Sequence, residues 1–222
     1  MDASELYDPE FRKLIKSKKQ TVIIPVGSLE QHGAHLPITT DSDIVTEIAS
    51  RLGKKCGFIV FPTISYAVSF EHDPLFNTSI DEKKFGLFLG EICLSLINSN
   101  VGKIIILNGH HGNIQALRKI FQEAFNYWEF MKHEFDHAGF VETSIMLAIS
   151  DKVKMKKAKK GFTTKGLSEE EIQRIKKLST ERGGFPKVAK NGVWGNPTGA
   201  TKKDGEKFLA EIVRNLAKEC QT

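Results

Sequence analysis

Two short motifs hold most of the residues in this chain that could do chemistry. Glu30-Gln31-His32 is followed by Asp41, and His110 lies in the glycine-flanked run NGHHGN at residues 108–113. Carboxylate oxygens and imidazole nitrogens together suit Zn, Mn or Fe(II), whereas a thiolate site would need cysteines. No cysteine lies near these motifs. The residue types therefore predict a hydrolytic metal centre with mixed oxygen and nitrogen ligands.

The spacing of the first motif suggests a centre with two ions. In an extended segment, Glu30 and His32 project toward the same side. Asp41 lies far enough along the chain for the backbone to turn back and offer a carboxylate that bridges both ions. Two ions about 3.5 to 4 Å apart could then share one water. Each residue alone could also be a surface acid or a loop histidine, but the ordered set favours a metal site.

The elements around these motifs predict an α/β fold. Residues 21–26, 58–61 and 103–107 are apolar runs without polar alternation, which is typical of buried parallel strands. Helices are expected at residues 43–52, 81–97 and 114 to about 125. Each ligand motif thus follows a strand and precedes a helix. We expect one domain with a mainly parallel sheet flanked by helices and a site at the carboxyl ends of the strands.

The second half of the chain gives plainer signals. Residues 127–130 are predicted as a strand, and helices are expected at residues 143–149, from Ser168 to about residue 178, and at residues 206–218. Residues 182–201 are rich in Gly, Asn and Pro. A loop of this length in a compact domain is usually functional, so we expect it to line the site or a subunit contact.

Several segments together resemble the creatininase (creatinine amidohydrolase) family. The run VGSLEQHGAHLP at residues 26–37, with Thr40-Asp41 after it, resembles the family signature. Further matches follow in the family's order: Ser69-Phe70-Glu71-His72, Phe76-Asn77-Thr78-Ser79-Ile80, Asn108-Gly109-His110, residues 137–144 and residues 195–201. The resemblance covers nearly the whole chain. It implies a single creatininase-like domain at residues 1–222 and a metal-dependent hydrolase of non-peptide C–N bonds in amides or formamides.

Carried over position by position, the resemblance implies a ligand set. Glu30, Asp41 and His110 would bind one metal, and His32 would share Asp41 with the second. The expected cofactors are two divalent metal ions per subunit, with Fe(II) favoured and Zn or Mn as alternatives.

One position departs from the family pattern. In the creatininase pattern, the second motif reads His-x-Glu, with a glutamate two residues after the histidine. In this chain the corresponding position is Gly112, which argues against creatinine as the substrate. Glu142 is our substitute candidate, either for the second metal or as the general base. Its alternative is an acid at a helix start that is favoured only by the helix dipole. For the acid that protonates the departing nitrogen, the candidates are His137, Glu142 and His111, in that order.

Within the family, the chain is most similar to the short archaeal branch that includes a formamide hydrolase of riboflavin and deazaflavin biosynthesis. That enzyme uses Fe(II) to remove formate from a formylamino-ribosylaminopyrimidinone monophosphate. We therefore expect a small, phosphorylated substrate. The alternatives are hydrolysis of another small amide or peptide, or a catalytically inactive protein that binds metal and serves in assembly. The family also forms ring-like or hexameric assemblies, which implies a homo-oligomer.

Composition narrows the remaining classes. The chain has 222 residues, 40% of them hydrophobic, with three scattered cysteines and a formal net charge of +5. Cysteines without CxxC spacing argue against a disulfide framework or zinc ribbon. No leader follows Met1, and no apolar run approaches the roughly 18 residues that span a bilayer. We expect a cytoplasmic protein that binds no membrane.

The lysine-rich run at residues 152–160 is the one candidate for a nucleic-acid surface. No aromatic residue interleaves with its lysines, and no nucleic-acid motif surrounds it. We interpret it as a solvated surface segment and expect no nucleic-acid partner. A narrower alternative is that it raises the local concentration of a phosphorylated substrate.

Overall fold

A computed structural model describes residues 1–18, 20–118, 123–134 and 136–220 of the chain. Within that part, four strands form one sheet: β1 (Thr21–Val26), β2 (Ile59–Val60), β3 (Lys103–Asn108) and β4 (Ala124–Asn126). The strand order is β2-β1-β3-β4, and every pair is parallel. The predicted single-domain α/β fold with a mainly parallel sheet is therefore confirmed.

The sheet is buried on both faces. Successive side chains of a strand point to opposite faces, and on β1 Ile23 belongs to one hydrophobic cluster whereas Val22 and Ile24 belong to another. On β3, Leu107 joins the cluster of Ile23, and Ile106 joins the other. Burial on both faces explains why these strands are continuous apolar runs in the sequence.

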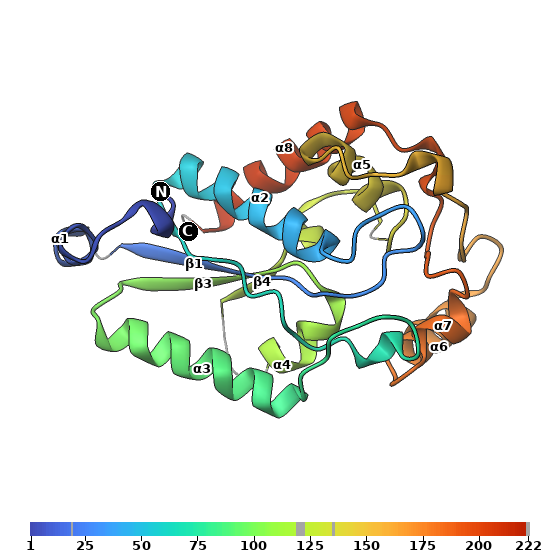
Figure 1. The fold of residues 1–222 in the computed structure, drawn as a ribbon, viewed down its shortest axis with the longest axis horizontal. Helices are drawn as coiled ribbons and strands as arrows, with labels where there is room; N and C mark the ends of the chain where they lie inside the picture. Colours follow the sequence, from blue (N-terminus) through green and yellow to red (C-terminus); the bar gives the residue numbers. More distant parts are fainter. Residues whose placement is uncertain (19, 119–122, 135, 221–222) are drawn as a thin grey trace.

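Helices cover the two faces of the sheet (Figure 1). On one side lie α2 (Thr40–Cys56), α5 (Phe140–Ile149) and α8 (Lys202–Glu219); on the other lie α3 (Glu82–Asn98) and α4 (Ile114–Arg118). The short helices α6 (Glu169–Ser179) and α7 (Phe185–Val188) lie at the end toward which the strands point, and α1 (Asp8–Lys18) lies at the other end. Short 3-10 turns occupy Ala3–Glu5, Phe70–His72, His111–Asn113, Tyr127–Phe130, Met155–Lys157 and Pro197–Gly199.

Two expectations around residue 125 are wrong. The helix expected to continue to about residue 125 is described over Ile114–Arg118, and residues 119–122 lie outside the described part. Ala124–Asn126 pair with β3 as β4, so the helix does not reach residue 125. The strand expected at residues 127–130 is a 3-10 turn. Its aromatic side chains suggest β structure, but that preference reflects packing on a sheet surface more than a backbone preference. Here Tyr127 is fully buried, with Trp128 edge-on at 5.3 Å between ring centroids.

Three predicted helices begin earlier than expected. α2 starts at Thr40, α5 at Phe140 and α8 at Lys202. For α2 and α8, the apolar period that locates a helix in the sequence begins only after a polar first turn, so the predicted start is too late. The first turn of α5 already contains Phe140 and Val141, so this reason does not apply there. The difference matters for α2, because the earlier start brings Asp41 into its first turn.

The topology leaves a crevice at one edge of the sheet. From the central strand β1 the chain crosses to β2 on one side and later to β3 on the other. In open parallel sheets, ligands bind at the carboxyl ends of strands where the chain reverses direction in this way. No helix among the described residues is long and apolar enough to cross a bilayer.

Candidate metal centre

The first turn of α2 packs closely against the carboxyl ends of β1 and β3. A Cβ at Gly27 would lie 2.6 Å from the Cα of Ser42, and a Cβ at Gly109 would lie 2.8 Å from the carbonyl oxygen of Asp41. Both contacts are shorter than packed atoms allow, so glycine is required for this approach. The two glycines therefore bring the Asp41 carboxylate into the crevice between the strands.

The first candidate ligand group is Glu30, Asp41 and His110. One ligand atom from each lies within 4.8 Å of the others, and all three side chains are almost completely buried. His110 Nδ1 lies 3.0 Å from Asp41 Oδ2, and His110 Nε2 lies 3.3 Å from Glu30 Oε2. The three residues that the resemblance assigned to one metal thus face one another.

The second group is His32, Asp41 and Glu142, again within 4.8 Å of one another. His32 Nε2 lies 3.1 Å from Asp41 Oδ1 and 3.6 Å from Glu142 Oε2. Asp41 belongs to both groups, as a bridging carboxylate would. Glu142, which lies in the first turn of α5, supplies a second carboxylate to this group beside that of Asp41. The ligand roles of all five residues remain a prediction.

Buried carboxylate oxygens that face mainly imidazoles make the centre suited to cations. Both carboxylate oxygens of Glu30, Oδ2 of Asp41 and Oε1 of Glu142 are buried. Imidazole nitrogens of His72 and His110 lie 3.0 to 3.3 Å from three of these four oxygens. A buried anion is costly unless it is paired, hydrogen-bonded or bound to metal. The imidazoles beside them are borderline ligands that accept the same ions. The residues present therefore fit divalent metal ions.

Burial and neighbouring charges also shift the pKa values of residues in the centre. Burial lowers the pKa of an imidazole, yet the charges of Asp41, Glu142 and Glu30 raise the pKa of His32 to about 10. Burial raises the pKa of Glu142 to about 8, against the charge of His32. The carboxylates thus hold a proton on the His32 imidazole. Since metal ions bind the same lone pairs, metal binding should release protons.

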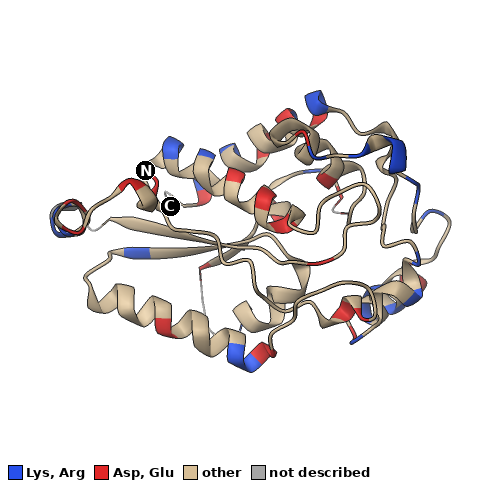
Figure 2. Ribbon diagram, viewed as in Figure 1, with Lys and Arg blue, Asp and Glu red and all other residues tan. Residues whose placement is uncertain are grey.

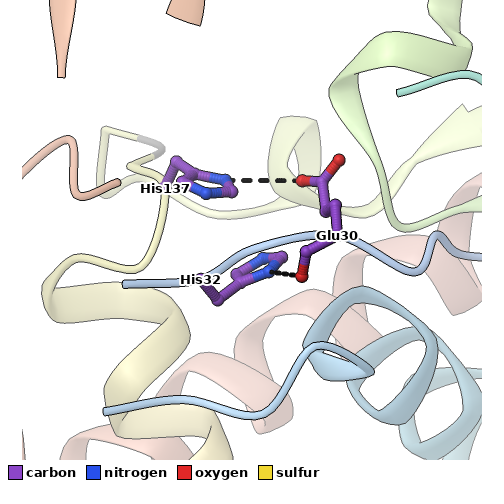
Figure 3. A group of neighbouring side chains, drawn as sticks. All are labelled: Glu30, His32 and His137. Carbon is purple, nitrogen blue, oxygen red and sulfur yellow. Dashed lines mark hydrogen bonds and ion pairs between the residues drawn. The ribbon is translucent and has the colours of Figure 1, made fainter. Parts of the chain in front are cut away.

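His137 lies directly above the first motif. Figure 3 shows its ring facing the Glu30 carboxylate, with the His32 ring below it. His137 Nδ1 lies 3.8 Å from Glu30 Oε1, and its Nε2 lies 3.1 Å from the carbonyl oxygen of Gln31. The rings of His137 and His32 are 4.3 Å apart between centroids. His137 is thus beside both ligand groups, where the prediction of a proton-transfer role requires it.

Comparison with known proteins decides the family. The model for creatininase, described as creatinine amidohydrolase, matches residues 4–220. The chain belongs to the creatininase family. It is 33% identical over 211 residues to the mycofactocin precursor peptide peptidase of Mycolicibacterium smegmatis, which covers 88% of this chain and 82% of that protein. As a member of this family, the chain is an enzyme that hydrolyses C–N bonds, and its metal dependence follows from the family and the buried ligand groups.

Two further similarities bear on fold and branch. A solved structure named "Creatininase Mn" superposes with a TM-score of 0.80 at 22% identity, over 98% of this chain and 96% of the other. The formylamino-ribosylaminopyrimidinone monophosphate deformylase of Methanosphaera stadtmanae is 34% identical over 149 residues, 60% of this chain and 62% of that protein. The family is therefore confirmed, whereas the deformylase branch is supported over a shorter stretch than the peptidase.

The departure at Gly112 from the creatininase pattern has a structural counterpart. A Cβ at Gly112 would lie 2.4 Å from Glu71 Oε1, 2.4 Å from the carbonyl oxygen of Val68 and 2.5 Å from His110 Nε2. Glu71 Oε1 itself lies 3.1 Å from His110 Nε2. The Glu71 carboxylate thus occupies the space that a side chain at position 112 would enter.

Sequence reasoning missed Glu71 and His72 as site residues. It used the run Ser69-Phe70-Glu71-His72 only as a family match, although a carboxylate next to an imidazole is itself a ligand signal. Both side chains are buried, and His72 Nε2 lies 3.1 Å from Glu30 Oε1. Together with Glu30 they form a further group whose ligand atoms lie within 4.8 Å of one another.

A pocket of about 280 Å³ opens onto these residues. It is lined by Asp41, Glu71, His72, His110, His111, Trp128, Glu134, Asp136, His137, Glu142, Lys176, Ser179, Thr180, Phe185 and Trp194. We call Trp128, Phe185 and Trp194 the aromatic wall. Two of its members lie within residues 182–201, which were expected to form a loop that lines the site or a subunit contact. Both line the pocket, but Phe185 begins the short helix α7 within that stretch.

Two other predictions from the sequence concern His111 and the lysine-rich run at residues 152–160. His111 lines the pocket and stacks on Trp128 at 6.0 Å between centroids, but it joins none of the candidate ligand groups among the described residues. The lysine-rich run at residues 152–160, all of it described, contributes no residue to the pocket. Its suggested role in concentrating a phosphorylated substrate at the site therefore gains no support from the pocket.

Proposed function

We propose that this chain is a two-metal amidohydrolase in which Glu30, Asp41 and His110 bind one divalent ion, and His32, Asp41 and Glu142 bind the other. The observation that carries the proposal is the position of Asp41, whose two oxygens lie 3.1 Å from His32 Nε2 and 3.0 Å from His110 Nδ1. A single carboxylate placed between two imidazoles in this way can bridge two ions. Fe(II) is the favoured metal, with Zn or Mn as alternatives.

Bound ions of this kind lower the pKa of a water toward neutrality and polarise a carbonyl oxygen. The chain's own residues must then move protons. His137 faces the centre, and burial together with neighbouring imidazole charges holds its pKa well below the ordinary value. A neutral imidazole accepts a proton, so His137 can take one from the attacking water and return it to the departing nitrogen. Glu142 and His111 are the alternative carriers.

For the substrate, we propose a formylamino-ribosylaminopyrimidinone monophosphate or a close analogue, which the enzyme would deformylate. The aromatic wall supports this proposal, because flat aromatic side chains stack on a planar pyrimidine. Deformylase relatives with 34% identity also support it. This activity would place the enzyme in riboflavin and deazaflavin coenzyme biosynthesis, where formate is released.

A second candidate is hydrolysis of a peptide bond in a small modified peptide. It is favoured by relatives named mycofactocin precursor peptide peptidases, which match 87% and 88% of this chain, compared with 60% for a deformylase. The two candidates share the metal centre and differ only in what the pocket holds beyond the scissile bond. They also share the expectation of negligible creatinine hydrolysis.

One experiment tests the metal and the substrate together. The protein is purified without oxygen, its bound metal is counted, and it is then loaded with Fe(II), Mn or Zn. Release of formate from formylated aminopyrimidine nucleotides is compared with cleavage of short peptides and of creatinine. Two ions per chain with formate release would support the first candidate. Peptide cleavage without formate release would replace it with the second, and efficient creatinine opening would refute both.

We also propose a homo-oligomer. α3 leaves Leu87, Phe88, Leu94 and Ile97 between 48% and 69% exposed. Large apolar side chains gathered on one exposed helix are typical of a protein contact. Light scattering after size-exclusion chromatography gives the subunit number, and a monomer at micromolar concentration would contradict the proposal.

A further inference from the structure

Lys176 has an unusual setting in the pocket. It lies in the last turn of α6, an element that supplies none of the candidate metal ligands. Among the described residues that line the pocket, Lys176 is the one lysine or arginine, whereas five are carboxylic acids. Figure 2 shows both acidic and basic residues on α6. The acidic residues lie in its first turn, and Lys176 and Lys177 lie in its last turn.

The Lys176 ammonium has no carboxylate partner in the described part of the chain. No ion pair there includes Lys176, although Glu134 and Asp136 line the same pocket. Ser179 and Thr180, three and four residues further along the chain, donate their hydroxyls to the backbone carbonyls of Lys176 and Lys177 at 2.8 and 2.9 Å. Because no ion pair in the described part of the chain includes Lys176, its ammonium can bind a group that enters the pocket.

Lys176 lines the same part of the molecule as the aromatic wall. Lys176, His111 and Trp128 all line the same pocket. His111 lies beside Trp128 in the wall. Lys176 therefore lies close enough to interact with a molecule that stacks on this part of the wall.

Helix chemistry alone would explain a lysine at this end of α6, because cations near a helix C-terminus interact favourably with the dipole. Lys177 occupies the same last turn and meets that need equally well, but it does not line the pocket. A comparison of Lys176 with Lys177 can therefore distinguish an interaction with the helix dipole from an interaction in the pocket.

We propose that Lys176 binds an anionic oxygen group of the substrate, a phosphate or a carboxylate, while the scissile amide lies at the metal centre. The part of this inference that places the scissile amide at the metal centre rests on the proposed function. A pocket of about 280 Å³ is small enough for one small molecule to contact both the ligand residues and Lys176. Lys176 is then a specificity-determining residue that selects acidic substrates.

Binding measurements test this without turnover. Phenyl phosphate and benzoate serve as anionic probes, and phenol and benzamide serve as their neutral counterparts, all titrated calorimetrically into the metal-loaded protein. We expect Lys176→Gln to weaken at least one anion by about five- to tenfold, with the neutral probes unchanged. Lys176→Arg should restore binding, and added salt should reduce the difference. Which anion responds identifies the source of the charge as phosphate or carboxylate.

Lys177→Gln is the matched control, because it removes the same charge from the same turn and should leave all four probes unchanged. The proposal is overturned if neither anion binds more tightly than its neutral counterpart, or if wild type and Lys176→Gln bind both anions alike. Equal losses in both variants would also overturn it in favour of a dipole effect. Formate release is scored separately: anion binding that depends on Lys176 in a protein that deformylates nothing would retain this inference and refute the deformylase proposal.

Discussion

The metal centre and the aromatic wall face the same pocket but are built in different ways. The centre combines Glu30, His32 and Asp41 from one stretch after β1 with His110 after β3 and Glu142 on α5, and its side chains are nearly completely buried. The wall combines Trp128 with Phe185 and Trp194, and both tryptophans are partly exposed. The comparison indicates that reaction type resides in the rigid centre, whereas substrate choice resides in the wall, where loops can vary without disturbing the ligands.

The largest expected effect on activity comes from a change in the metal centre, at Asp41. Asp41→Asn should remove most bound metal and reduce activity on the order of a thousandfold or more, because an amide is a poor bridging ligand. Metal counting and steady-state kinetics check this. Asp43→Asn is the matched control, since it changes an acid in the same turn of α2 that pairs with Lys152 on the surface. Two ions retained per chain in Asp41→Asn would refute the bridging role.

The next prediction asks whether Glu142 is a metal ligand of the centre or only a general base beside it. If Glu142 is a ligand, Glu142→Gln should lose the second ion while the first remains. If it serves only as a general base, both ions should remain and the rate should fall by about a hundredfold or more. The ratio of bound metal to protein, measured beside kcat, distinguishes the two. A variant with both ions and wild-type turnover would leave Glu142 as an acid at a helix start.

Sequence reasoning predicted the centre better than the wall for a physical reason. Glu30 and His32 lie between a buried strand and a helix, Asp41 lies in the first turn of that helix, and local pattern alone indicates this order. For the wall, the sequence predicts a strand at Trp128 and a loop at Phe185. Which of these side chains line one pocket depends on how the 3-10 turn at Tyr127–Phe130, α7 and the segment around Trp194 pack together, and no periodicity in the sequence reports that packing.

Glu71 shows the same limit inside the centre itself. Its role follows from the missing side chain at Gly112, and that complementarity is visible only when both residues are seen in space. The family pattern pointed to Gly112 as a loss and to Glu142 as the sole compensation. The structure adds a second carboxylate, Glu71, beside His110.

Gly112→Ala should disturb the centre while leaving the wall in place. Its Cβ would meet Glu71 Oε1 and the Val68 carbonyl oxygen at 2.4 Å, and overpacking of this kind costs about 1 to 3 kcal/mol. We expect a lower unfolding free energy in urea and weaker metal retention, because His110 must move. Gly90→Ala is the control, and its free energy of unfolding should change in the opposite direction. A Cβ at Gly90, on α3, would meet nothing within 4 Å, so the free energy of unfolding should rise by about 0.5 to 1 kcal/mol. A Gly112→Ala protein as stable and as metal-rich as wild type would show that Glu71 does not need this space.

The smallest expected effect lies in the wall. Phe185 packs on His72 at 4.6 Å and on His137 at 4.7 Å between ring centroids, so it joins the wall to the centre by ring contacts alone. Phe185→Leu keeps an apolar side chain of similar reach but removes the ring. Aromatic contacts contribute about 0.5 to 1.5 kcal/mol beyond their buried area, which corresponds to a roughly two- to tenfold rise in KM for a substrate that stacks there. Metal content and kcat should stay near wild type, because no ligand atom has changed. A fall in bound metal with KM unchanged would reverse the assignment, since it would make Phe185 a support for the centre and leave substrate choice to Trp128, Trp194 and Lys176.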